Sequence, residues 1–191
     1  MKLSRDFYLR NDVVQVSREL LGKYLFTKLN GTTTAGIITE TEAYAGITDR
    51  ASHAYGGRRT RRTEIMYAEG GTAYVYLCYG IHHLFNVVTN KKDIPHAVLI
   101  RAVSPEKGIE TILKRRKQNR LHRKIAVGPG TVSQALGIHT GHSGENLLGS
   151  KIWIEDRGIT MKEKEVIAGK RVGVDYAGKD ALLPYRFIAR L

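Results

Sequence analysis

The Asn30-Gly31 pair restricts the fold of this chain more than any other short feature, because it separates two strand-like runs. Asn-Gly favours a two-residue hairpin turn, since both positions tolerate positive φ. The run before it, KYLFTKL, covers 23–29, and the run after it, TAGIITE, covers 34–40. The sequence therefore predicts two antiparallel strands joined by a tight turn.

The remaining elements follow in an irregular order. Asn11 and Asp12 are suitable caps for a helix that starts at Val13 and ends at Gly22. Ser104-Pro105 is expected to open a second helix that continues to about residue 119. A short helix is expected over 131–136, further strands over 71–90 (with a break near residue 80), 96–103, 150–156 and 183–189, and a long loop over 49–71. Without a regular β-α-β rhythm, this order favours a single α+β domain over a doubly wound sheet.

The charge balance indicates the kind of partner. The chain has 31 Lys and Arg against 18 Asp and Glu, a formal net charge of +13. Such an excess predicts a polyanionic partner, and nucleic acid is favoured over an anionic membrane. No run approaches the roughly 20 apolar residues of a membrane span, and no secretory signal is visible. With Cys78 as the single cysteine, these features predict a reduced cytoplasmic (or nucleoid) or nuclear location, without secretion.

Two stretches concentrate the positive charge. The loop GGRRTRRTEIM, residues 56–66, places arginines between small residues, and arginine pairs bidentately with phosphate. Phosphate contact is therefore expected for Arg58, Arg59, Arg61 and Arg62. The run LKRRKQNRLHRK, residues 113–124, is expected to form a solvated face or to add salt-sensitive, non-specific affinity.

The run AYVYLCYG, residues 73–80, is rich in aromatic side chains. Side chains alternate between the two faces of a strand, so Tyr74 and Tyr76 share one face. Tyr79 stands beside Gly80, where a turn would place it at the tip of a hairpin. From that position its ring is suited to wedge between stacked bases, whereas most strand aromatics are core residues.

The stretch ITETEAY, residues 38–44, places Glu40 and Glu42 on one face of an extended segment. Three interpretations stay open: the two carboxylates act as an acid and a base, they bind Mg²⁺ for a nuclease with help from Asp49, or they form salt bridges to arginines. His53 has small neighbours that leave room for a ligand, but no zinc-binding spacing accompanies it. A metal or cofactor is not expected.

These motifs together resemble the alkyladenine DNA glycosylases, the 3-methyladenine DNA glycosylases of the single-domain α+β type. The resemblance extends from about residue 20 to 189, and its most specific pieces occur in the order ETEAY with His53, RRTRRTEIMY, GTAYVYLCYG through Asn86, AVLIRA, VGPG with QALGI, and RVGVDYAG with PYRF. It implies one domain over 1–191, with a curved, mainly antiparallel sheet, flanking helices and a protruding β-hairpin.

The resemblance also implies the chemistry, which is hydrolysis by a monofunctional glycosylase without lyase activity. Glu42 is similar to the general base that activates a water against C1′ of the damaged nucleotide. Arg101 would hold this water and a nearby phosphate, and the carbonyl of Val172 would complete the water site. The implied substrates are alkylated or deaminated purines: 3-methyladenine, 7-methylguanine, hypoxanthine and ethenoadenine.

Further residues are implied to bind DNA. In this resemblance Tyr44, His53 and Tyr76 stack on a base flipped out of the duplex, and the His53 N–H bonds its edge. Asn86 disfavours guanine, Tyr79 is the wedge, and Met66 lies against the opposite strand. The expected partner is damaged double-stranded DNA, bound by a monomer.

Two departures from the family pattern occur. Thr131 stands where the family commonly places a lysine, and His82-His83 follow the wedge where other members carry larger or apolar side chains. An alternative is a non-catalytic module that binds DNA or RNA on the same scaffold. Glu42 argues against it, because a carboxylate beside phosphates lowers affinity.

Overall fold

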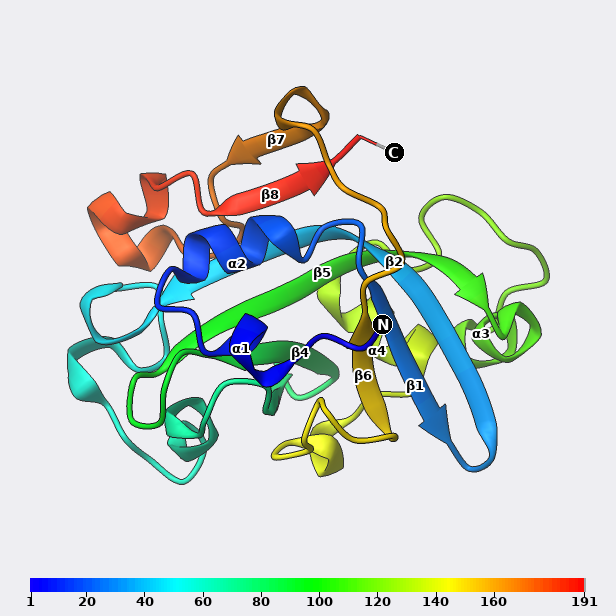
Figure 1. Ribbon diagram of the computed structural model, residues 1–191, viewed down its shortest axis with the longest axis horizontal. Helices are drawn as coiled ribbons and strands as arrows, with labels where there is room; N and C mark the ends of the chain where they lie inside the picture. The colour runs from blue at the N-terminus through cyan, green and yellow to red at the C-terminus, as the bar shows by residue number, and fades with distance from the viewer. Residues whose placement is uncertain (191) are drawn as a thin grey trace.

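The predicted hairpin is present in the computed structural model, which describes residues 1–190 (Figure 1). It joins β1 (Tyr24–Leu29) to β2 (Thr32–Ala45), and both turn residues have positive φ, 51° at Asn30 and 76° at Gly31. β2 has 14 residues and continues past the expected return strand. Glu42 and Tyr44 therefore lie on a strand rather than in the loop that follows it.

β2 is the centre of a sheet whose strand pairs are all antiparallel. The main path runs β3-β4-β5-β2-β1-β6, and β8 pairs with both β2 and β7. β1 pairs with the first part of β2, and β8 pairs with residues 40–42, so two strands share one edge of β2. The other strands are β3 (Ala73–Cys78), β4 (His82–Thr89), β5 (His96–Lys107), β6 (Ile152–Glu155), β7 (Val166–Gly169) and β8 (Arg186–Ala189). The α+β prediction is thus confirmed.

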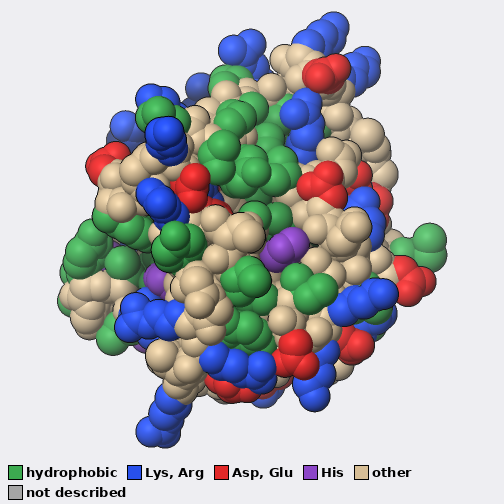
Figure 2. Space-filling view, turned by 90° about the vertical axis from the view of Figure 1, so that its left-hand side faces the viewer, with side chains coloured by type: hydrophobic (Ala, Val, Ile, Leu, Met, Phe, Trp, Pro, Cys, Tyr) green, Lys and Arg blue, Asp and Glu red, His purple; other side chains and the backbone are tan. Residues whose placement is uncertain are grey.

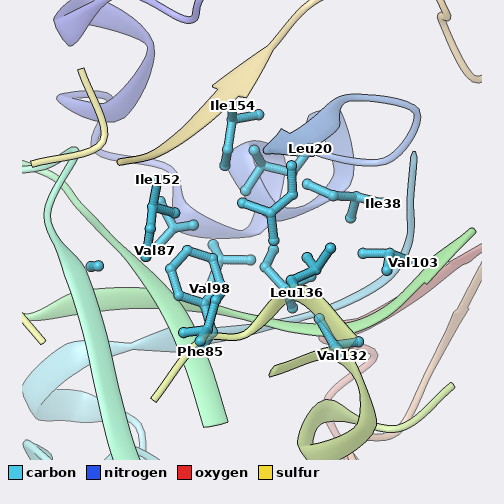
Figure 3. Packing of buried hydrophobic residues seen from close by; sticks show 14 of the residues in the cluster. Leu20, Ile38, Phe85, Val87, Val98, Val103, Val132, Leu136, Ile152 and Ile154 are labelled. Atoms are coloured by element: carbon cyan, nitrogen blue, oxygen red, sulfur yellow. The ribbon is translucent and has the colours of Figure 1, made fainter. Parts of the chain in front are cut away.

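The helices are short and pack around this sheet. They are α1 (Arg5–Tyr8), α2 (Val13–Glu19), α3 (Ile109–Arg116) and α4 (Pro129–Leu136). Asp12 caps α2 as predicted, since its carboxylate accepts the Gln15 N–H at 2.9 Å. Side chains from α2, α4 and the strands meet in one core, where Leu20 and Leu136 lie close to Val98 and Phe85 (Figure 3).

The prediction that a helix starts at Ser104-Pro105 is wrong. β5 continues to Lys107, and α3 starts only at Ile109, after Gly108 in the left-handed region. Pro105 pairs opposite Gly36 where the β2–β5 register shifts. A register irregularity accommodates a residue without an N–H, so proline there does not interrupt the strand.

The segment predicted as a long loop, 49–71, contains two single-turn 3-10 helices, η2 (Tyr55–Gly57) and η3 (Glu64–Tyr67), and another, η1 (Gly46–Thr48), lies directly before it. Further single-turn helices are η4 (Thr140–His142) and η5 (Glu163–Glu165), and the longer η6 covers Asp175–Leu182. On the side of the molecule seen in Figure 2, hydrophobic side chains gather near the centre, with Lys and Arg mostly around them. Among residues 1–190, no helix has the length and apolar character needed to cross a membrane.

Candidate active site

Two carboxylates of β2 point to the same side of the strand, as their spacing predicts. Thr41, between them, faces the other way and donates to the Ser17 carbonyl of α2 at 2.9 Å. Arg101 of β5 contacts both acids, with Nε 2.9 Å from Glu40 Oε1 and Nη1 3.4 Å from Glu42 Oε2. Arg186 of β8 also binds Glu40, at 2.6 Å. Glu40 therefore binds two guanidinium groups. Glu42 contacts one guanidinium group, that of Arg101, at the longer distance of 3.4 Å.

Glu42 is fully buried and receives hydrogen bonds from backbone and side chain. The Tyr44 hydroxyl donates to its Oε2 at 2.9 Å, and the Val172 N–H donates to Oε1 at 2.8 Å. Burial raises the pKa of the Glu42 carboxyl above its ordinary value, and Arg101 is the strongest of the groups that oppose this rise. A carboxylate with a raised pKa is a stronger base than an exposed one, so Glu42 is suited to take a proton from water.

A cavity of about 590 Å³ opens beside this carboxylate. Tyr44, Arg101 and Val172, which hold Glu42, all line the cavity, so the acid lies directly behind its wall. Val172 contributes its N–H to Glu42, whereas the family resemblance implied a role for its carbonyl. The other predicted residues in the wall are His53, Arg62, Met66, Tyr76, Tyr79 and Asn86.

Three rings form one aromatic side of the cavity. Tyr74 and Tyr76 stack with centroids 5.4 Å apart, and the His53 ring meets Tyr76 edge-on at 4.7 Å. The shared face of the two tyrosines is confirmed. The sequence reasoning missed Tyr74 as part of the site, although strand parity placed it beside Tyr76. Its hydroxyl lies 2.9 Å from His53 Nδ1 and fixes the orientation of the imidazole.

His53 is neutral at physiological pH. Burial, helped by Arg62 and Arg58, lowers the pKa of its imidazole to about 4. A neutral ring stacks on a purine without adding a charge to the cavity.

Asn86 and Met66 are both buried. The Asn86 amide donates to the carbonyls of Tyr74 and Leu84, at 3.1 and 3.3 Å, so its orientation is fixed. Met66 is only 2% exposed and packs with Tyr67 and Tyr74 under the cavity. This burial does not fit the expected contact of Met66 with the opposite DNA strand, because such a contact needs an exposed side chain.

Tyr79 occupies the tip of the β3–β4 hairpin, as predicted. Its φ is +50° and that of Gly80 is +72°, and the ring is 90% exposed. A non-glycine residue in the left-handed region costs free energy, so this turn holds the ring outward at some expense. Tyr79 also lines the mouth of the cavity.

The four arginines of the basic loop have different surroundings. Arg59 forms ion pairs with Glu64 and Asp93, at 2.7 and 2.8 Å, and lies over the Tyr67 ring. It is therefore engaged within the protein, contrary to the expectation of a free phosphate contact. Arg58, Arg61 and Arg62 are exposed, and of these three Arg62 lines the cavity.

The Mg²⁺ interpretation is wrong, because its three carboxylates do not converge. Asp49 is buried in an ion pair with Arg171, whose Nη2 lies 2.8 Å from Asp49 Oδ1. Within the described part of the chain, His, Cys, Asp and Glu side chains form no cluster of three arranged to hold a metal ion. Arg171 was missed because 122 residues separate it from Asp49, and nothing in their local sequence links them.

Residues 6–190 match the family model of methylpurine-DNA glycosylase. The chain belongs to the methylpurine-DNA glycosylase family. A Chlamydia felis protein that bears the name 3-methyladenine DNA glycosylase is 44% identical over 190 residues, 99% of this chain and 96% of the relative. Proteins of the same name from Clostridium perfringens strain 13 and Desulfitobacterium hafniense are 44% and 41% identical, over 98% and 97% of this chain and 95% and 94% of their own lengths. This methylpurine-DNA glycosylase family member is thus a DNA N-glycosylase, a hydrolase of N-glycosyl bonds.

Thr131 and His82, two of the residues that depart from the family pattern, line the cavity of this glycosylase. Thr131 donates from Oγ1 to the Gly128 carbonyl at 2.7 Å, in the first turn of α4. His82 packs against Gly130, where an added Cβ would lie only 2.9 Å from Nδ1 of the imidazole. The histidine and the glycine therefore fit one another, which the separate motifs did not reveal.

Proposed function

We propose that this glycosylase removes alkylated or deaminated purines from double-stranded DNA, after the damaged nucleotide has rotated into the cavity. The observation that carries this proposal is a buried carboxylate, Glu42, held by three groups that themselves line an aromatic cavity. The four purines expected from the sequence, 3-methyladenine, 7-methylguanine, hypoxanthine and ethenoadenine, are the proposed substrate class.

Glu42 acts as the general base in this proposal. A water displaces the Arg101 guanidinium from its 3.4 Å contact, the longest of the three to Glu42. Its oxygen bonds to C1′, the N-glycosidic bond breaks with its electron pair passing to the purine, and the water proton passes to Glu42. Water is the nucleophile, so no lysine forms a covalent link to the sugar and no strand cleavage follows.

Aromatic contacts offset the cost of removing a base from the duplex. Unstacking and unpairing cost a few kcal/mol, least at damaged sites, and each stacked base regains about 1–3 kcal/mol. Tyr44 and Tyr76 both line the cavity, and His53 packs edge-on against Tyr76. We propose that the purine stacks between these rings.

The function is tested with duplexes that carry one of the four lesions, in the presence of EDTA. Abasic sites should form without a divalent cation, at a rate well above that of an undamaged duplex. Release of none of the four bases would refute the proposal.

Replacing Tyr79 by alanine is expected to weaken binding to damaged duplex by about 5- to 100-fold, as the loss of one stacking contact implies. Binding to undamaged duplex should change much less, because the wedge fills the gap that only a rotated base leaves. Fluorescence anisotropy with matched duplexes measures both affinities. An equal loss on the two duplexes would contradict the role of Tyr79 as a wedge.

The rate of base release is expected to fall at acid pH. A general base works only when deprotonated, and the pKa of the Glu42 carboxyl is raised by burial. The rate should therefore decrease as the pH falls through a midpoint above the ordinary glutamate pKa of about 4.5. Single-turnover rates on a hypoxanthine duplex measure this profile. His53→Gln should keep the midpoint, because the pKa of His53 is already lowered to about 4; a midpoint that moves with this variant would contradict the assignment.

A further inference from the structure

Arg62 brings a guanidinium group into the wall of the base cavity. Its Nη2 lies 3.0 Å from His53 Nε2, and its central carbon lies 5.4 Å from the centroid of the Tyr76 ring. Because guanidinium only donates, Nε2 of His53 must accept, and the ring proton is on Nδ1, which bonds the Tyr74 hydroxyl. Arg62 therefore fixes the tautomer of His53 and lies over the ring of Tyr76.

Tyr44, the second tyrosine proposed to stack on the base, also faces a guanidinium. The central carbon of Arg171 lies 4.9 Å from its ring centroid. The charge of Arg171 is balanced by Asp49, whereas among residues 1–190 no carboxylate lies within 4.0 Å of the Arg62 guanidinium. Each stacking ring thus already attracts one cation, and the charge of Arg62 adds to the potential in the cavity.

A positive charge in this place discriminates between two kinds of damaged purine. Guanine methylated at N7 and adenine methylated at N3 carry a positive charge in DNA, and an arginine nearby repels them. Neutral purines that carry a carbonyl, such as hypoxanthine, feel no such repulsion and accept hydrogen bonds from guanidinium. Cation–π attraction to Tyr76 is also weaker for a second cation, because Arg62 already uses that ring.

On the basis of the proposed function, we propose that Arg62 is a specificity-determining residue that favours neutral, carbonyl-bearing purines over cationic alkylated purines. The residue acts through direct contact with the bound base, in addition to its hydrogen bond with His53. Its position at the mouth of the cavity lets solvent screen part of its charge, so the expected discrimination is moderate.

The test compares single-turnover release of hypoxanthine and 7-methylguanine from the same duplex sequence, in the wild type and in three variants. R62Q removes the charge but keeps an N–H donor for His53, and R62K keeps the charge. R61Q is the matched control, because it removes one charge from the adjacent exposed residue of the same loop. We expect R62Q to raise the rate for 7-methylguanine relative to hypoxanthine by about three- to tenfold, and R62K and R61Q to keep the wild-type ratio within twofold.

The outcomes separate this inference from the function on which it rests. If the wild type releases neither base, the proposed function fails. If the wild type is active but R62Q changes both rates by the same factor, Arg62 only occupies space in the cavity and the inference is overturned. A shift in R61Q equal to that in R62Q would also overturn it, because the effect would then belong to the general charge of the loop. Should R62Q fail to fold, the wild type alone provides the test. For each base, its rate of release is divided by the rate of spontaneous release. An enhancement as large for 7-methylguanine as for hypoxanthine would refute the charge preference.

Discussion

Replacing Glu42 by glutamine is expected to slow base release by about 100- to 10,000-fold, the usual contribution of a positioned general base. Glutamine has nearly the same shape, and its carbonyl oxygen is able to accept from the Val172 N–H or the Tyr44 hydroxyl. It cannot take a proton from water at neutral pH. Affinity for a hypoxanthine duplex should therefore stay close to that of the wild type, while the single-turnover rate collapses.

Glu40→Gln is the matched control for this experiment. It is the same chemical change, two residues away on the same face of β2, but Glu40 is bound by Arg101 and Arg186. We expect this variant to lose stability and less than about tenfold in rate, since the loss of an ion pair does not remove the base. A Glu42→Gln enzyme with wild-type rate, or a Glu40→Gln enzyme with the greater loss, would show that the base has been assigned to the wrong residue.

Strand parity explains why much of the site was predictable. A period of two residues decides which side chains share a face, and neither a longer strand nor a small error in its end changes that relation. The pairs Glu40 with Glu42 and Tyr74 with Tyr76 were therefore predicted correctly, even though β2 is longer than expected. The prediction of a turn at Asn30-Gly31 was also correct, because the φ angles of these two residues depend on local sequence.

Contacts between distant segments were not predictable in the same way. The start of α3 was wrong because pairing with β2 keeps Pro105 in a strand, and that pairing depends on a residue about seventy positions earlier. Arg59 was expected to meet phosphate, but Asp93 arrives from a different loop to neutralise it. Local sequence gives the charge of a side chain, whereas its availability depends on the partners that the fold brings to it.

The ion pair between Arg171 and Asp49 is the clearest case of such a distant contact, and its loss should have a large effect on stability. The side chains are 0% and 2% exposed, and Arg171 also donates to the carbonyls of Ala43 and Asp180. Replacing Arg171 by methionine leaves the Asp49 carboxylate buried beside an apolar group. Removal of one partner from a buried pair costs about 3–5 kcal/mol. We expect R171M to lower the free energy of unfolding by this amount, measured by urea denaturation with an unchanged m-value.

Two further variants separate the ion pair from general effects of the substitution. Lys170→Met changes the adjacent, exposed residue and should alter the free energy of unfolding by less than about 0.5 kcal/mol. Combining Asp49→Asn with R171M removes the unpaired charge, so the double variant should be more stable than R171M alone. If the free energy of unfolding of R171M lay within about 1 kcal/mol of the wild-type value, the ion pair would contribute far less to stability than its burial implies. Because Val172 directly follows Arg171 and binds Glu42, R171M should also slow base release under conditions where it is still folded, which links the stability of this segment to the position of the proposed base.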